Sequence, residues 1–165
     1  MTEPFVFRTS RLLDAPRDLV WKAWTEPERL AEWMSPAGVT VAHTAMDLRV
    51  GGIYHYGLRN PDGDIYWGRW VFQEITAPER LVVITSFSDP AGGVTRHPLG
   101  PEWPLETHST TTLAEEDGGT RLTLAWTPWN ATESELQAFA GGAASMEKGW
   151  GGTLAQLEAY LARLQ

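Results

Sequence analysis

Histidine, the side chain most often used for metal binding and proton transfer, is sparse and scattered in this sequence. The chain holds four, and none is paired at the spacing of a zinc finger or of one helical turn: His43, His55, His97 and His108. We therefore expect no metal site. We also expect no cofactor, because Gly51 and Gly52 lack the further glycines or the lysine of a phosphate-binding loop. With no cysteine and no serine nucleophile elbow, the common covalent nucleophiles are absent.

Acid–base catalysis is harder to exclude, because a titratable group that faces an apolar pocket has its pKa moved toward neutrality. The candidates are His55, Arg69, Glu106, His108, Tyr54 and Tyr56. Strand alternation predicts that His108 points outward if Leu113 and Leu122 point inward, and that His55 points outward if the two tyrosines point inward. Arg69 could bind an anionic head group or lie on the surface. The catalytic residues, if any, stay undefined.

Tryptophan is unusually frequent, with nine residues in a chain of 165. These bulky side chains either fill an aromatic core or line a cavity for an apolar ligand. Strand and helix periodicity predicts ten residues as the lining of such a cavity: Trp33, Met46, Tyr54, Tyr56, Trp70, Phe87, Thr111, Trp126, Met146 and Trp150. This set is apolar with a few hydroxyls, which suits a small aromatic or lipid-like molecule.

The elements that would position these residues begin with the last stretch, Ser145 to Gln165. Its apolar residues follow each other at intervals of four, four, three, four and three, the period of one helical face: Met146, Trp150, Leu154, Leu157, Leu161 and Leu164. We expect a long helix with this stripe turned toward the core. A second helix is predicted from a capping box of Thr132 and Glu135 as far as Phe139, with Gly141 and Gly142 separating the two.

Most of the remaining chain alternates in the manner of β-strands. Seven are expected, at 5–13, 39–48, 53–59, 65–75, 81–88, 106–115 and 120–129. A bulge near Gly68 would reverse the inward and outward faces around Trp70. Two short helices are expected after the first strand, one with Pro16 in its first turn and one capped by Thr25 with Glu28. These patterns predict one α+β domain over residues 1–165, a curved antiparallel sheet covered by the final helix.

Residues 89–104 interrupt the alternation with four prolines and three glycines. A structureless run of this length is uncommon in a compact domain and is often functional. Its Arg96, His97 and Trp103 could reach over a cavity mouth, or the run could be a plain surface insertion.

The composition restricts partners and location. The formal net charge of −8 disfavours nucleic acid, which needs a basic face. No apolar run approaches the roughly 20 residues of a membrane helix, and the first residues lack a signal-peptide pattern. We expect no membrane partner and, with no cysteine present, a cytoplasmic protein.

Several segments in order resemble one protein family. They are 8–13 with Ala15–Pro16, Val20–Trp21, Pro27–Glu28, 47–52, Gly63, Gly68, Glu74–Ile75, 78–81, 119–123, Met146 and Gly149–Trp150. Together they resemble the bacterial proteins related to the C-terminal domain of the activator of heat shock protein 90 ATPase, within the START or polyketide-cyclase (SRPBCC) superfamily. The resemblance covers nearly the whole chain. It implies the helix-grip fold, a sheet of six or seven strands wrapped around the C-terminal helix.

Three functions are compatible with this resemblance, because a fold alone does not select an activity. The first is binding of a small hydrophobic ligand between the sheet and the C-terminal helix. The second is an enzyme of the cyclase or hydrolase kind that uses a pocket Tyr, His or Arg. The third is a module that interacts with a chaperone, although the eukaryotic activator carries an additional N-terminal domain for which this chain has no room. The ligand and the oligomeric state stay undefined at this point.

Overall fold

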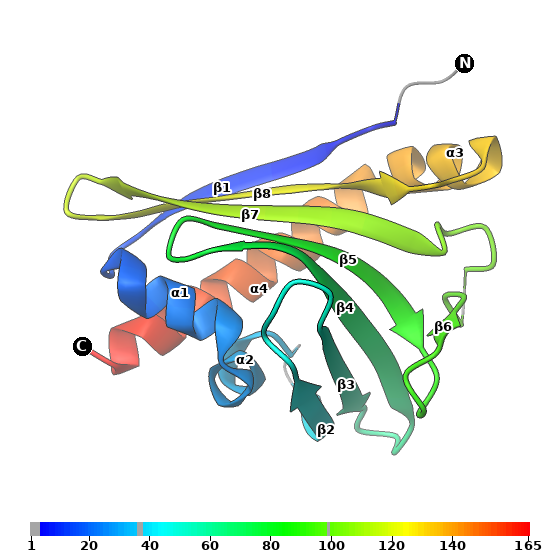
Figure 1. Ribbon diagram of the computed structural model, residues 1–165, viewed down its shortest axis with the longest axis horizontal. Helices are drawn as coiled ribbons and strands as arrows, with labels where there is room; N and C mark the ends of the chain where they lie inside the picture. Colours follow the sequence, from blue (N-terminus) through cyan, green and yellow to red (C-terminus); the bar gives the residue numbers. More distant parts are fainter. Residues whose placement is uncertain (1–3, 36–37, 99) are drawn as a thin grey trace.

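The computed structural model describes residues 4–35, 38–98 and 100–165, which form an antiparallel sheet and four helices (Figure 1). The strands are β1 (Phe7–Leu13), β2 (Thr40–Met46), β3 (Ile53–Arg59), β4 (Ile65–Thr76), β5 (Arg80–Ser88), β6 (Val94–Thr95), β7 (Glu106–Glu116) and β8 (Gly119–Trp129). The helices are α1 (Arg17–Thr25), α2 (Pro27–Trp33), α3 (Glu133–Gly141) and α4 (Ala143–Arg163). The predicted α+β helix-grip architecture is confirmed: the seven predicted strands and the long C-terminal helix are present, and the short β6 is an additional strand.

The strands follow the order β1-β8-β7-β5-β4-β3-β2, and the short β6 pairs with the end of β5. The first and last strands of the chain therefore lie side by side, since β1 pairs with β8 along its whole length. Tight turns set the register of consecutive strands. At the β7–β8 turn, Asp117 and Gly118 both have positive φ, 51° and 80°, as a two-residue turn of this kind requires.

Helix α4 lies against one face of the curved sheet (Figure 1), and its apolar stripe forms the centre of the core. Met146, Leu154, Leu157 and Leu161 are buried, and Trp150 is half-buried. Leu164 departs from the predicted stripe, because it caps the helix beyond the packed region and is 43% exposed. No described helix is both long enough and apolar enough to cross a membrane.

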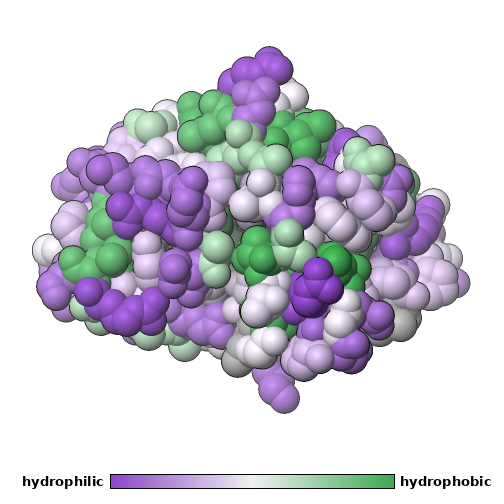
Figure 2. Space-filling view, turned by 90° about the horizontal axis from the view of Figure 1, so that it is seen from below, coloured by the Kyte–Doolittle hydropathy of each residue, from purple (hydrophilic) through white to green (hydrophobic). Residues whose placement is uncertain are grey.

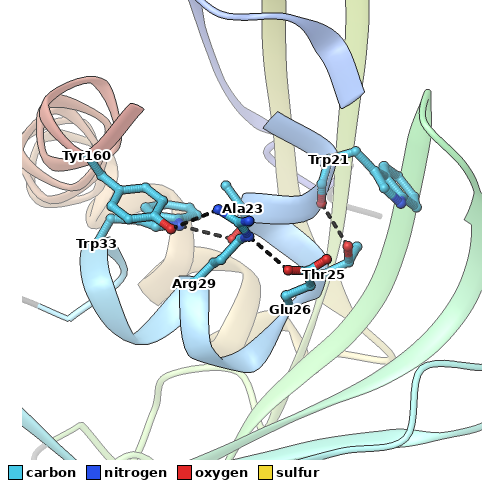
Figure 3. Close-up of polar contacts among 7 residues, drawn as sticks. All are labelled: Trp21, Ala23, Thr25, Glu26, Arg29, Trp33 and Tyr160. Carbon is cyan, nitrogen blue, oxygen red and sulfur yellow. Dashed lines mark hydrogen bonds and ion pairs between the residues drawn. The ribbon is translucent and has the colours of Figure 1, made fainter. Parts of the chain in front are cut away.

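Of the two predicted helix-capping boxes, one is confirmed and one is wrong. Thr132 and Glu135 form the predicted capping box of α3, and Gly142 separates α3 from α4. The box predicted for α2 is wrong. Glu26 stands at its N-cap position with Pro27 as the first helical residue, and the Thr25 hydroxyl instead donates a hydrogen bond to the Trp21 carbonyl oxygen at 2.8 Å (Figure 3).

The two short helices are fixed to each other and to α4 by polar contacts, shown in Figure 3. Arg29 donates to the Glu26 carboxylate at 2.8 Å and to the Tyr160 hydroxyl of α4 at 3.2 Å. The indole N–H of the fully buried Trp33 donates to the Ala23 carbonyl oxygen at 3.0 Å. The helix pair thereby becomes a fixed wall at one end of the sheet.

Two features of the sheet bear on the sequence expectations. The pairing of β3 with β4 runs without a shift through Gly68, and the irregularity in β4 lies between Phe72 and Glu74 instead. The faces around Trp70 are therefore not reversed. The segment 89–104, expected to be structureless, contains β6 and continues the sheet locally.

The outer surface is mixed in character. On the face drawn in Figure 2, hydrophobic residues form small groups separated by hydrophilic ones. Scattered exposed apolar residues of this kind are ordinary for a folded domain and do not by themselves indicate an interface.

Candidate functional site

A cavity of about 190 Å³ lies between the sheet, the helix pair and α4. Its wall is built by side chains that alternate inward on β3, β4, β5, β7 and β8, together with residues of α1, α2, β2 and α4. We call it the inner cavity. It occupies the place where the apolar faces of sheet and helix do not meet.

Aromatic residues dominate the wall of the inner cavity. They are Trp24, Trp70, Trp126, Trp150, Tyr54 and Tyr56. Aliphatic side chains fill the gaps: Leu30, Ala31, Met34, Val41, Leu58, Leu81 and Val83. Hydroxyl groups come from Ser35, Thr85, Ser109 and Thr111. Among the described residues, no Asp, Glu, Lys, Arg or His lines this cavity, so it favours an uncharged occupant.

The two tyrosines stay neutral at ordinary pH. Burial raises the pKa of Tyr54 to about 12, and a hydrogen bond with Thr44 opposes the shift. Burial also raises the pKa of Tyr56, reinforced by the nearby Tyr54, while a hydrogen bond with Trp70 opposes it. Their rings lie 5.1 Å apart between centroids. Both phenols can therefore act as hydrogen-bonding groups without carrying charge.

The position of Tyr56 depends on the residue opposite it. The β3–β4 register pairs Tyr56 with Gly68, and the phenol ring lies over the Gly68 backbone. A Cβ atom at position 68 would stand 2.7 Å from Tyr56 Cε2 and even closer to the ring's hydroxyl end. Glycine is thus required for Tyr56 to lie flat against β4.

A second space, of about 470 Å³, adjoins the first. We call it the outer hollow. It shares the side chains of Tyr56, Leu58, Thr85 and Trp126 with the inner cavity. Its remaining wall includes Phe87 on β5 and His97, Trp103 and Pro104 from the segment 89–104.

The described residues of this segment, 89–98 and 100–104, which we call the strap, are held over the outer hollow by α3. Arg96 forms an ion pair with Glu135, and it also donates to the Trp103 carbonyl oxygen at 3.4 Å. The Trp103 ring packs against Trp126 and Phe139, with centroids 6.1 and 5.3 Å away. The strap is therefore an anchored cover, as one of the two sequence interpretations proposed.

Burial would raise the pKa of Glu135, whose side chain is 7% exposed. Hydrogen bonds from Arg96 and from backbone N–H groups, together with the Arg96 charge, outweigh burial and hold the pKa of Glu135 below its ordinary value. The same carboxylate also completes the capping box of α3 by accepting from the Thr132 N–H at 2.9 Å.

A third space, an open groove of about 780 Å³, follows the first half of α4. Trp126 borders this groove, the outer hollow and the inner cavity alike. Trp150 borders the groove and the inner cavity. The three spaces are therefore grouped around Trp126.

The ten predicted lining residues are distributed unevenly. Six line the inner cavity: Tyr54, Tyr56, Trp70, Thr111, Trp126 and Trp150. Phe87 lines the outer hollow and Met146 the groove. Two depart from the prediction and line none of these spaces. Trp33 is fully buried in the α1–α2 junction, where its indole N–H donates a hydrogen bond to the Ala23 carbonyl oxygen. Met46 packs against the core at the end of β2.

Several lining residues escaped the sequence prediction. Trp24 and Ala31 come from the short helices, whose angle to the sheet periodicity alone does not give. Val83 lies in a strand whose apolar residues follow each other without alternation, so the sequence does not indicate which of them point into the cavity. Ser109 shares the inward parity of Thr111 and could have been included on that signal.

The charged acid–base candidates lie outside the inner cavity. His55 alternates with the inward tyrosines, stacks on Trp67 at 5.1 Å, and its Nε2 lies 3.2 Å from the Asp89 carbonyl oxygen. Arg69 donates to the Gly92 carbonyl oxygen at 2.8 Å. His108 stacks on Trp129 at 5.4 Å, and burial followed by the nearby Arg80 charge lowers its pKa.

Glu106 sits at the start of β7, opposite Trp129 of β8, and is likewise outside the cavity wall. Of the candidates, only Tyr54 and Tyr56 face the cavity. The rings of His43 and His55 lie 5.1 Å apart. Within the described residues, however, no three His, Cys, Asp or Glu side chains gather closely enough to share a metal ion.

The chain resembles known structures over nearly its full length. A protein from Arthrobacter aurescens matches with TM-score 0.76 and 29% identity, over 96% of this chain and 86% of that one. A Nitrosomonas europaea protein matches with TM-score 0.73 and 26% identity, over 97% and 96%. A Mycobacterium smegmatis protein matches with TM-score 0.75 and 23% identity, over 97% and 96%. No curated protein matches the chain.

A family model adds the decisive match. The family described as activator of Hsp90 ATPase homolog 1-like protein matches residues 14–162, from the end of β1 to the last turn of α4. This span includes every element that lines the three spaces around Trp126. The chain therefore belongs to the activator of Hsp90 ATPase homolog 1-like family.

Proposed function

We propose that this protein binds a small, uncharged aromatic molecule in the inner cavity. The observation that carries the proposal is the composition of the cavity wall: four tryptophans and two neutral tyrosines, with no charged side chain among the described lining residues. Ligand sites are commonly apolar clefts with a few placed polar groups, and the hydroxyls of Tyr54, Ser109 and Thr111 supply such groups here.

The proposal extends neither to catalysis nor to a chaperone partner. The tyrosines that face the cavity hold their protons more tightly than usual, which disfavours them as bases near neutral pH. Trp103 of the strap packs against Trp126 and Phe139 and is only partly exposed, so it offers little apolar surface to a chaperone.

Thermal unfolding with matched compounds tests this function. Phenol, para-cresol and indole should stabilise the protein, while benzoate and benzylamine should not, because the cavity offers no partner for a charge. At a concentration of about 100 times Kd, a ligand raises the melting temperature by roughly 5–10 °C for a chain of this size. Equal effects of charged and neutral compounds, or no effect of any, would contradict the proposal.

A cavity-filling variant locates the effect. Ala31 lies on α2 in the cavity wall, so Ala31→Leu should abolish the shift by occupying the ligand's space. Ala155 is exposed on α4, and the same change there should leave the shift intact. If Ala155→Leu abolished the shift as completely as Ala31→Leu, the site would not be the inner cavity.

A further inference from the structure

The inner cavity is small for the set of aromatic side chains that surrounds it. An apolar cavity of roughly 150 Å³ in another protein accommodates benzene. The 190 Å³ of the inner cavity therefore suits one substituted ring and leaves no room for a second. Any larger ligand must continue into an adjoining space.

Two spaces adjoin the inner cavity: the groove shares two lining residues with it and the outer hollow shares four, so we take the outer hollow as the continuation. Tyr56, Leu58, Thr85 and Trp126 form a wall common to both volumes. The hollow holds about 470 Å³, and Phe87 and Trp103 extend its aromatic lining. No Asp, Glu, Lys or Arg contributes to its wall in the described part of the chain. The outer hollow differs from the inner cavity in having one histidine, His97, in its described lining.

Within the common wall, Tyr56 is the residue whose position depends on a neighbour. Its phenol lies over Gly68, and the hydrogen bond with Trp70 holds it there. Because a Cβ atom at position 68 would stand 2.5 Å from Tyr56 Cζ, any larger residue would push the phenol off the sheet. Because Tyr56 lines both volumes, a displaced ring would reduce the space that a ligand spanning them can use.

We propose that the ligand is an elongated, uncharged molecule of two linked rings, one in the inner cavity and one in the outer hollow. Gly68 determines this length by keeping Tyr56 flat against β4, so that the ligand can extend past it. The proposal rests on the proposed function, namely that the inner cavity binds an uncharged ring. It adds a size preference and assigns that preference to one glycine.

Calorimetric titration of the whole chain with three probes tests the length and the charge. Para-phenylphenol should bind at least about tenfold more tightly than phenol, because its second ring becomes buried in the outer hollow. Biphenyl-4-carboxylate should bind at least about tenfold more weakly than para-phenylphenol, since no Lys or Arg lines either space among the described residues.

The variant Gly68→Ala tests the assignment. It should lower the affinity for para-phenylphenol by about tenfold and change the affinity for phenol by less than about threefold. Gly149→Ala is the matched control, because a Cβ atom there meets nothing within 4 Å, and it should change neither affinity. Should Gly68→Ala not fold, Tyr56→Leu replaces it and should increase the preference for the two-ring probe.

The outcomes separate the two proposals. If phenol binds and para-phenylphenol is no tighter, or if Gly68→Ala weakens both equally, the two-ring inference is wrong and the proposed function stands. If no uncharged probe binds the unmodified chain, the proposed function fails and the inference fails with it.

Discussion

The indole N–H of Trp33 is bonded to the Ala23 carbonyl oxygen at 3.0 Å, which fastens α2 to the last turn of α1. That carbonyl lies near the helix end, where backbone oxygens lack partners within the helix. Neighbouring Trp24 is equally buried, and its N–H has no partner among the described residues. The two rings contact each other at 4.9 Å, and the tryptophans differ in this bond and in their place, since Trp24 lines the inner cavity and Trp33 does not.

Substitution of each tryptophan by phenylalanine should separate the contribution of the hydrogen bond to stability from the contribution of the ring volume that is lost. We expect Trp33→Phe to lower the free energy of unfolding by about 1–2 kcal/mol more than Trp24→Phe, because only the first leaves a buried carbonyl unpaired. Denaturant unfolding of the two variants measures the difference. Equal losses would show that the Trp33 bond contributes nothing beyond packing.

Glu135 should make stability depend on acid pH. Its folded pKa lies below the ordinary value of 4.5, so the folded chain releases its proton more readily than the unfolded chain. The resulting stabilisation is present above about pH 4.5 and is lost as the pH falls through the lower folded value. Glu135→Gln keeps an acceptor for the Thr132 N–H but loses the ion pair with Arg96.

We therefore expect Glu135→Gln to cost about 1–2 kcal/mol at neutral pH, a value reduced by the half-exposed position of Arg96. The free energy of unfolding, followed from pH 6 downward, should then decline less steeply in the variant. Arg96→Gln serves as the control that removes the same pair from the other side. A decline as steep in Glu135→Gln as in the unmodified chain would locate the acid sensitivity elsewhere.

The cavity tyrosines should make the protein sensitive to alkali. The folded pKa of Tyr54 is about 12 against an ordinary 10.0, so between these values the unfolded chain loses a proton that the folded chain keeps. Stability should decrease over that interval. Ultraviolet absorbance of phenolate should show two late-titrating tyrosines, Tyr54 and Tyr56, of which one disappears in Tyr54→Phe. An unchanged late-titrating amplitude in this variant would mean that Tyr54 is not one of the buried groups.

Gly149 should be replaceable with a gain in stability. It lies in α4, and a Cβ atom at this position would meet nothing within 4 Å. Alanine is favoured over glycine inside a helix, so Gly149→Ala should raise the free energy of unfolding by about 1 kcal/mol. Calorimetry should detect a melting temperature higher by roughly 2–4 °C. A decrease would indicate that the first half of α4 requires the flexibility of glycine.

The sequence predicts the sheet and α4 well, because their signals are local and periodic. The stripe from Met146 to Leu161 and the inward parity of Tyr54, Tyr56 and Thr111 follow from spacings of three to four residues and of two. Thr132 and Glu135 similarly predict the start of α3 from a local hydrogen-bonding pattern.

The shape of the site depends on packing that periodicity does not encode. Trp33 has the spacing of an inward residue, but the angle between α1 and α2 buries it behind Trp24 rather than in the cavity wall. The strap is anchored by Arg96 and Glu135, which are separated by 39 positions in the sequence. The contact between Gly68 and Tyr56 likewise needs the strand register, which only the folded structure provides.

A crystal structure of the protein soaked with para-bromophenol would test the central claim most directly, since anomalous scattering locates the bromine atom without ambiguity. We predict a bromine position inside the inner cavity, between Trp24, Trp70 and Tyr54. Bromine found only on the outer surface, or an inner cavity filled by repacked side chains, would contradict the proposed function.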